Sequence, residues 1–258
     1  MTFAFSGVQV ASFAAAAFCT LVLPVVLLIV LAVIKKIRLA PLALGFVSFF
    51  VSQMVLRIPL LQMLNAAGAL NAIAANTVLY AVVVGGLSAG LFEETARLGG
   101  AAILKNYRTW KDMVSFGLGH GLCEVMLVMG MAYLNNLLLA AALTDPAGPL
   151  GLLLTGLDSA ALQQLTAQLA AIGPGLAALA LLERVSAVLF HLFATSLVFT
   201  AVIRRKPLWY FAAVAAHTLF NAVAVLLSAG LVATELALLT LGLCGGGYVL
   251  AARRKWPA

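Results

Sequence analysis

Long apolar runs, each about the length needed to cross a bilayer, follow one another through most of this sequence. A helix that spans the hydrocarbon core of a membrane needs roughly 20 apolar residues. Because that core holds no water to satisfy free backbone groups, such runs fold as a bundle of helices. We therefore predict an all-α polytopic membrane protein with about seven transmembrane helices. The expected spans are residues 8–34, 39–64, 72–104, 113–139, 176–203, 207–229 and 231–251.

The composition agrees with this class. Hydrophobic residues make up 64% of the 258 residues and charged residues only 9%, whereas a soluble domain is about 45–50% apolar and about 25% charged. These values exclude a disordered chain, an ordinary soluble enzyme and a nucleic-acid-binding domain. We expect one transmembrane helical domain over residues 1–258, integral to a plasma membrane, with the lipid bilayer as its surroundings. The sequence does not define an oligomeric state.

The basic residues predict the orientation. Twelve of the fifteen Lys and Arg residues lie in four clusters between or after apolar runs. Basic loops stay on the cytoplasmic side of a membrane. With seven spans and the N-terminus outside, all four clusters are cytoplasmic, which predicts an N-out, C-in topology. The clusters are Lys35, Lys36 and Arg38; Lys105, Arg108 and Lys111; Arg204, Arg205 and Lys206; and Arg253, Arg254 and Lys255.

Residues 140–175 form the one long predicted loop, and this topology places it outside. Apolar residues recur at helical spacing between Leu157 and Ile172. Asp158 or Ser159 is expected to cap that helix, because short polar side chains accept hydrogen bonds from a first helical turn. We interpret it as an amphipathic helix on the outer leaflet. A lid over a substrate entrance is the alternative.

Ionisable and amide side chains lie inside the apolar spans, where they are costly and mark functional sites by default. Counting about 1.5 Å per residue from the cytoplasmic clusters places them roughly 12–23 Å deep on four different helices. We predict that they gather around one cavity. The set comprises Glu93, Glu94, Arg97, His120, Glu124, His191, His217 and Asn221. Three further charges near the outer boundary, Arg57, Glu183 and Arg184, are interpreted as interfacial residues or a structural ion pair.

Helical spacing places several of these residues on shared faces. The i,i+4 pairs are Glu93 with Arg97, His120 with Glu124, and His217 with Asn221. Residues three or four apart are neighbours on a helix. Glu93 and Glu94 point about 100° apart, so one can face a cavity while the other pairs with Arg97 or a neighbouring helix. Glycines on either side of His120 allow a close helix contact or room for a ligand.

This set of residue types suits peptide hydrolysis. That reaction needs a general base for water and a donor for the oxyanion. A poorly solvated glutamate provides the base, and histidine or asparagine provides the donor. The histidines His120, His191 and His217 also match the three protein ligands of a catalytic zinc site. The sequence has no His-Glu-x-x-His motif, so both a zinc-dependent and a metal-free mechanism remain open.

Short motifs resemble a known superfamily. The run Phe92–Arg97 contains a Glu-Glu-x-x-Arg pattern and, with Phe116-x-x-x-His120 and His217-x-x-x-Asn221, is similar to the CAAX and bacteriocin-processing membrane proteases. The strings Phe-Gly-x-Gly-His-Gly-x-x-Glu at 116–124 and Glu-Arg…His at 183–191 most resemble the YhfC intramembrane metalloproteases. PrsW and the gamma-secretase scaffold subunit belong to related families. The resemblance covers residues 72–229, which it implies to be the catalytic core.

The resemblance implies an intramembrane endopeptidase acting on membrane-embedded or membrane-anchored peptides in a prokaryotic plasma membrane. In this reading a glutamate activates water, with or without zinc. The resemblance implies that Glu93 is the base and that Glu94 and Arg97 support it. His120 would assist Glu93 or bind a metal, and His217 and Asn221 would stabilise the oxyanion unless His217 binds the metal. His191 and Glu124 would add ligands and so favour the metal-dependent mechanism.

Two other functions fit a buried polar layer. A scaffold that binds partner helices needs no catalysis, and a proton-coupled transporter uses similar Glu and His relays. Transporters often show repeats or broken helices, and no repeat is visible in this sequence. Neither alternative needs adjacent Glu93 and Glu94 with Arg97 close by, and we therefore favour the protease.

Overall fold

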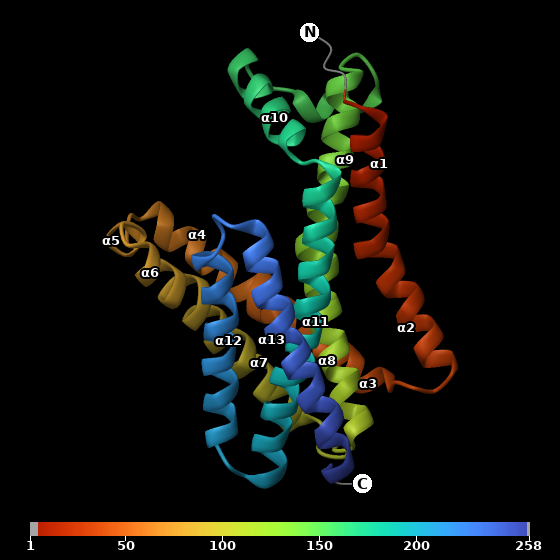
Figure 1. Ribbon diagram of the computed structural model, residues 1–258, viewed down its shortest axis with the longest axis vertical. Helices are drawn as coiled ribbons and strands as arrows, with labels where there is room; N and C mark the ends of the chain where they lie inside the picture. The colour runs from red at the N-terminus through yellow and green to blue at the C-terminus, as the bar shows by residue number, and fades with distance from the viewer. Residues whose placement is uncertain (1–4, 257–258) are drawn as a thin grey trace. The chain divides into compact units, whose positions relative to one another are not determined.

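The computed structural model describes residues 5–256, and regular structure within them is entirely helical (Figure 1). Seven stretches are long and apolar enough to cross a membrane. The labelled helices within them are α1 (Gly7–Ala17), η1 (Phe18–Val22) and α2 (Leu23–Val33); α3 (Leu39–Phe49), η2 (Phe50–Arg57) and α4 (Ile58–Ala66); α6 (Thr77–Leu79), η3 (Tyr80–Leu87) and α7 (Ser88–Ile103); α8 (Trp110–Glu124), η4 (Val125–Gly130) and α9 (Met131–Thr144); α11 (Pro174–Arg204); α12 (Leu208–Leu226); and α13 (Leu231–Ala252) with η6 (Arg253–Lys255).

These helices confirm the predicted all-α membrane fold and its seven spans. The third span begins at Thr77, five residues later than predicted, because Asn76 caps it by accepting a hydrogen bond from the Leu79 N–H at 3.0 Å. The preceding residues form a separate short helix, α5 (Asn71–Ala74). The fourth span continues to Thr144, past its predicted end at 139. Turn-forming residues therefore moved the boundaries by about one helical turn.

The chain divides into two compact units. Of the described residues, those up to Leu27 together with Val125–Leu182 form unit 1. Leu28–Glu124 together with the residues from Glu183 onward form unit 2. Whether they act as the single domain predicted over 1–258 stays a prediction. All eight predicted site residues lie in unit 2.

Unit 1 is held together by apolar packing. Phe13, Tyr133 and Leu143 are buried in one cluster with residues of the predicted outer loop. That loop contains the 3-10 helix η5 (Pro149–Leu154) and the helix α10 (Ser159–Ala171). Asp158 caps α10 by accepting a hydrogen bond from Ala161 N at 2.8 Å. Leu169 of α10 is buried in the same cluster, so α10 is part of this core as well as amphipathic.

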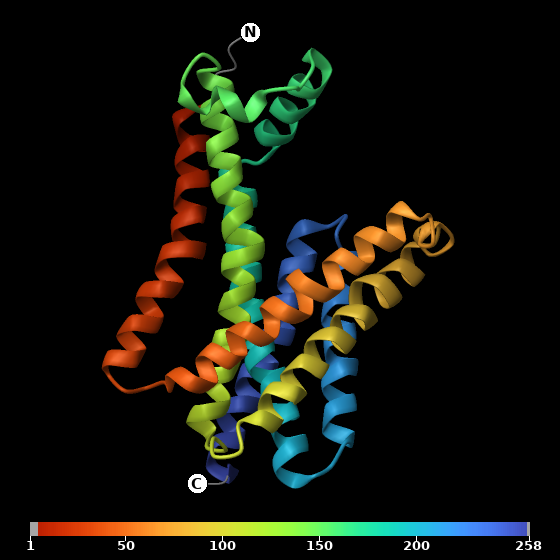
Figure 2. The same ribbon diagram turned by 180° about the vertical axis from the view of Figure 1, so that it is seen from behind.

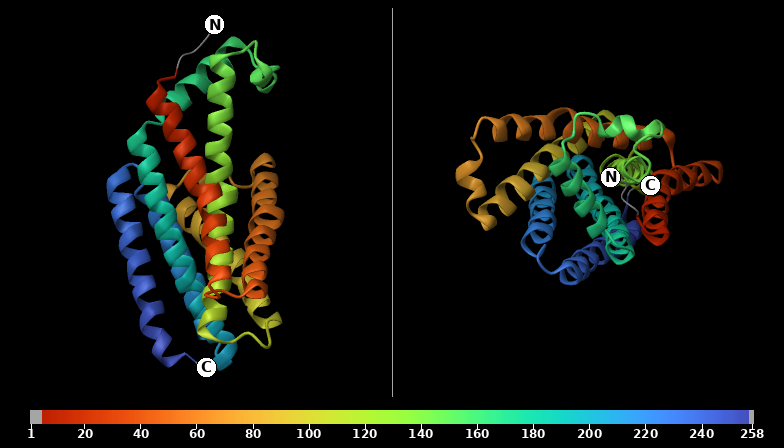
Figure 3. Two further views of the ribbon diagram at one scale, coloured as in Figure 1. Left: turned by 90° about the vertical axis from the view of Figure 1, so that its right-hand side faces the viewer. Right: turned by 90° about the horizontal axis from the view of Figure 1, so that it is seen from above.

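In unit 2 the second and third spans form a hairpin, with η2 and α3 in contact with α7 (Figure 2). Helix α12 packs against α7 and η3, and α13 runs antiparallel beside α12 (Figure 3). These contacts place α7 against helices from two other spans. Its charged residues are consequently shielded from lipid.

Helices α3 and α8 approach each other at two reciprocal glycines. A Cβ atom on Gly45 of α3 would lie 2.0 Å from the Phe116 carbonyl oxygen, and one on Gly119 of α8 would lie 2.0 Å from the Leu42 carbonyl oxygen. Only residues without side chains allow such close backbone contact. Of the two roles predicted for the glycines around His120, Gly119 serves close helix approach. The contact brings His120 against α3.

Candidate functional site

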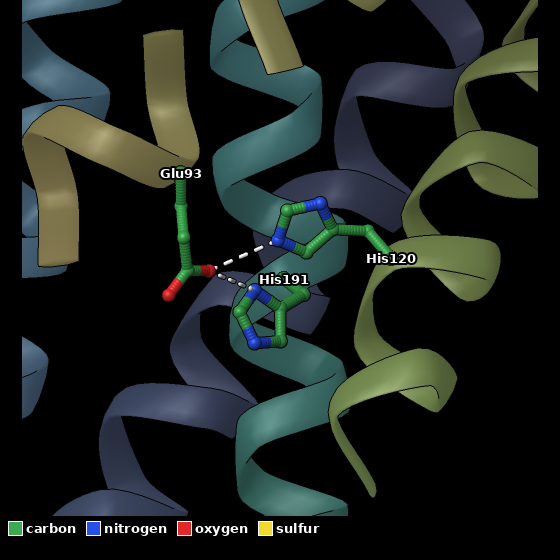
Figure 4. A group of neighbouring side chains, drawn as sticks. All are labelled: Glu93, His120 and His191. Atoms are coloured by element: carbon green, nitrogen blue, oxygen red, sulfur yellow. Dashed lines mark hydrogen bonds and ion pairs between the residues drawn. The ribbon is translucent and has the colours of Figure 1, made fainter. Parts of the chain in front are cut away.

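Glu93 of α7 lies at the centre of the buried polar residues in unit 2. Its Oε2 atom is 2.9 Å from His120 Nε2 of α8 and 4.0 Å from His191 Nδ1 of α11. Both imidazoles point toward its carboxylate (Figure 4). Its Oε1 atom is 3.6 Å from His217 Nε2 of α12. Three histidines from three helices thus face one carboxylate, and Glu93 is only 4% exposed.

Each histidine has its other ring nitrogen held by an oxygen atom. His120 Nδ1 is 2.8 Å from Ser48 Oγ on α3. His217 Nδ1 is 2.6 Å from Glu94 Oε1, and His191 Nε2 is 2.5 Å from Glu124 Oε2. Metal-binding histidines almost always have such an oxygen partner on the second nitrogen, which fixes the ring and its tautomer. The arrangement around Glu93 matches that pattern three times.

The hydrogen-bond network assigns the tautomer of His120. Ser48 Oγ lies 2.7 Å from the Gly45 carbonyl, to which it donates its only hydrogen. It must then accept a hydrogen from His120 Nδ1, because a hydroxyl has one donor. This assignment leaves the lone pair of His120 Nε2 facing Glu93 Oε2 at 2.9 Å. Two acceptors this close repel each other unless a proton or a metal ion supplies positive charge.

Arg97 connects two parts of the site. Its Nη1 atom contacts both carboxylate oxygens of Glu94, one of them at 2.5 Å. Its Nη2 atom is 3.0 Å from His191 Nδ1. A guanidinium only donates hydrogen bonds, so His191 accepts at Nδ1 and donates from Nε2 to Glu124. Arg97 and Glu94 are both fully buried. Burial of these two charges is tolerated because they are paired with each other.

Glu124 belongs to a second group of interacting charged side chains. It accepts hydrogen bonds from His191 and from Arg184 Nη1, the latter at 2.7 Å. Arg184 also contacts Glu183. The i,i+4 spacing of His120 and Glu124 therefore does not lead to a hydrogen bond between them. His120 and Glu124 share a helix face, but α3 and α7 supply the partners of His120 while α11 supplies those of Glu124. Arg184 and Glu183 form the predicted structural ion pair.

Asn221 lies one turn beyond His217 on α12. Its side-chain Nδ2 donates to the Gly85 carbonyl at 3.3 Å. Among the described residues no hydrogen bond joins it to Glu93, so its oxyanion role stays a prediction. Two residues that contact the site were missed: Ser48, and Gln53, which donates to Glu93 at 2.6 Å. Each is a polar residue inside an apolar span, and that signal was present in the sequence.

The residues fit a metal ion by donor chemistry. Glu93, His120 and His191 each place one ligand atom within 4.8 Å of the others, and imidazole and carboxylate are usual zinc ligands. His217 Nε2 is also free to bind, because its proton lies on the nitrogen that faces Glu94. His191 Nδ1 accepts from Arg97, so it can ligate only if Arg97 gives up that bond. The site thus offers the three predicted histidines, two of them with free lone pairs.

The chain has seven apolar helices and, within unit 2, a buried Glu and His centre; together these features define a multi-pass membrane protein with a metal-binding type of site. A family model described as YhfC intramembrane metalloprotease matches residues 19–240. The chain therefore belongs to the YhfC family, as the sequence motifs predicted.

One relative is the "Uncharacterized membrane protein YhfC" of Bacillus subtilis (strain 168), which is 33% identical over 151 residues. That match covers 58% of this chain and 58% of the relative, so it spans less than two thirds of either protein. No solved structure matches the chain.

Proposed function

We propose that this protein is an intramembrane metallopeptidase that hydrolyses peptide bonds of membrane-embedded or membrane-anchored substrates. One observation carries the proposal: three imidazoles, each fixed by an oxygen partner, face the buried carboxylate of Glu93. The family description supports the same activity. A scaffold that only binds helices gains nothing from such a centre.

In this mechanism Glu93 is the general base. It takes a proton from a water molecule as the water oxygen attacks the carbonyl carbon of the peptide. It then gives the proton to the amine that leaves when the C–N bond breaks. Burial of Glu93 keeps bulk water away from the reacting groups, and donors that are already oriented stabilise the developing oxyanion. We assign Asn221 that role, as its motif implies.

The histidines His120, His191 and His217 would hold a zinc ion. When bound, zinc supplies a Lewis acid and lowers the pKa of water. Glu94 orients His217 and Glu124 orients His191, each through the hydrogen bond described above. Arg97 keeps Glu94 in place and Arg184 does the same for Glu124. These supporting residues hold the imidazoles in position before substrate arrives.

The wider placement is also proposed. We assign the chain to the superfamily of CAAX proteases, PrsW and the gamma-secretase scaffold, with residues 72–229 as the catalytic core. The four basic clusters support an N-out, C-in orientation in a prokaryotic plasma membrane. Reporter fusions after each predicted loop test the orientation, and a cytoplasmic signal from the N-terminal fusion would contradict it.

The activity test compares membranes that contain the parent protein or its variants. We expect Glu93→Ala and His120→Ala to abolish the appearance of new peptide termini in membrane proteins while expression stays unchanged. Glu235→Gln is a matched control, because Glu235 is a buried acid of α13 outside the site. If both site variants process substrates at the parental rate, the peptidase proposal fails.

Elemental analysis of the purified protein tests the metal. We expect about one zinc per chain and loss of activity with a chelator. A zinc content below about a tenth of an equivalent, with activity insensitive to the chelator, would exclude the three-histidine ligand set.

A further inference from the structure

The second span, which lies outside the predicted core at 72–229, reaches Glu93 through Gln53. The Gln53 side chain is buried in η2, and its Nε2 atom donates to Glu93 Oε1 at 2.6 Å. The other oxygen of Glu93 faces His120 and His191. Gln53 therefore fixes the carboxylate oxygen that also lies 3.6 Å from His217 Nε2, and with it the orientation of the whole carboxylate.

The direction of the Gln53 amide is fixed by Arg57. Arg57 Nη1 lies 3.0 Å from Gln53 Oε1. Because a guanidinium can only donate, that atom must be the amide oxygen, and the NH₂ group must face Glu93. An amide turned the other way would present its carbonyl oxygen to the Glu93 carboxylate, and the two would repel each other.

Arg57 is itself held by the span that carries Glu93. Its Nε atom donates to Ser88 Oγ at 2.9 Å and its Nη2 atom to the Val84 carbonyl at 2.8 Å. Ser88 precedes Glu93 by five residues on α7. Arg57 ends η2, and Val84 lies in η3; both segments have the wider hydrogen bonding of a π-helix. Such segments within α-helices occur frequently at functional sites.

We propose that Gln53 is a positioning residue, which donates to Glu93 Oε1 and so fixes the orientation in which the carboxylate is presented to the metal and water. This inference rests on the proposed metallopeptidase function. A neutral amide suits the role better than a cation, because a Lys or Arg in direct contact would pair with Glu93 and weaken it as a base or ligand. Arg57 orients the amide while its own charge stays one side chain away.

The test uses the purified full-length protein with Zn²⁺ and Co²⁺ as probes. Gln53→Met keeps the length of the side chain and removes the donor. We expect zinc affinity, measured by competition with a chromogenic chelator, to fall 10- to 100-fold, as for other residues that orient metal ligands. We also expect the visible absorption spectrum of bound Co²⁺ to change, because that spectrum reports ligand geometry.

Two further variants separate positioning from folding. Ser52→Ala is the matched control, because Ser52 is the buried neighbour of Gln53 and bonds only to the Phe49 carbonyl among the described contacts. We expect parental zinc affinity and a parental Co²⁺ spectrum. Arg57→Met leaves Gln53 in place but frees its amide to turn. We expect Arg57→Met to lower zinc affinity by less than Gln53→Met does. If Gln53→Met does not fold, Arg57→Met still tests the proposal.

The outcomes distinguish the two proposals. If the parent binds one metal ion and Gln53→Met and Arg57→Met match it in affinity and spectrum, Gln53 has no positioning role and the metallopeptidase proposal stands. If Ser52→Ala weakens the site as much as Gln53→Met, the effect comes from general packing and the inference is overturned. If the parent binds neither metal, the metal proposal falls and the Gln53 inference falls with it.

Discussion

Units 1 and 2 bury very different side chains. Among the described residues of unit 1, no charged, amide or histidine side chain is buried, and the buried Thr20 hydroxyl donates to the Ala16 carbonyl of its own helix. Unit 2 buries Glu93, Glu94 and Arg97 together with three histidines. The difference shows that one part of the chain is organised by packing and the other by matched polar groups.

The buried charged groups of unit 2 have a free-energy cost of burial that the apolar core of unit 1 does not have. A charged group inside a membrane protein costs several kcal/mol unless it is paired. In unit 2 Arg97 and Arg184 are each paired with a glutamate, and each histidine is bonded to an oxygen. Such an arrangement is retained because of what it does, since apolar residues of the same size would hold the helices together at less cost.

The largest effect is expected for Glu94→Gln. The substitution leaves the fully buried Arg97 without its carboxylate, and breaking a buried pair in this way costs about 3–5 kcal/mol. Unfolding in increasing SDS measures the loss, and chelator competition should show weaker zinc binding. Glu235→Gln, a buried acid with one unpartnered oxygen, serves as the control. Equal losses of stability for Glu94→Gln and Glu235→Gln would contradict the expectation that a buried acid paired with an arginine contributes more.

An intermediate effect is expected for Leu143→Ala in unit 1. Leu143 is 1% exposed in the apolar core, and deleting its side chain leaves a cavity that costs about 2 kcal/mol. We expect lower stability in the SDS titration and parental zinc affinity. Leu152→Ala is the control, because Leu152 is 80% exposed. Weaker zinc binding by Leu143→Ala would show that the site depends on packing in unit 1, which would contradict the distinction between the two units.

The smallest effect is expected for Glu124→Gln. Arg184 keeps its contact with Glu183 after the change, and the Glu124 side chain is 19% exposed. The stability loss should therefore be smaller than for Glu94→Gln, because Arg184 keeps one carboxylate partner. Zinc affinity should fall by about tenfold at most, because His191 exchanges a charged acceptor for a neutral amide oxygen. A larger stability loss for Glu124→Gln than for Glu94→Gln would contradict this prediction.

Much of the fold could be predicted because a bilayer leaves few choices. Apolar length and basic clusters predicted the seven spans, and the cap at Asp158 followed from one residue type. The Glu94 contact with Arg97 is local, at i,i+3, and helix geometry alone predicts it. The partner of Glu124 could not be predicted in this way. Helix spacing suggested His120, whereas His191 from another span supplies the contact.

The sequence by itself determined that this chain crosses a membrane seven times and carries Glu and His groups at one depth, because hydropathy and helical rise are properties of single segments. Only the tertiary structure decided that Glu93 is the shared centre, that each histidine has a separate oxygen partner, and that Gln53 reaches Glu93 from the second span. Those facts depend on which helices approach closely, and glycine contacts such as Gly45 with α8 set that approach between residues far apart in the chain.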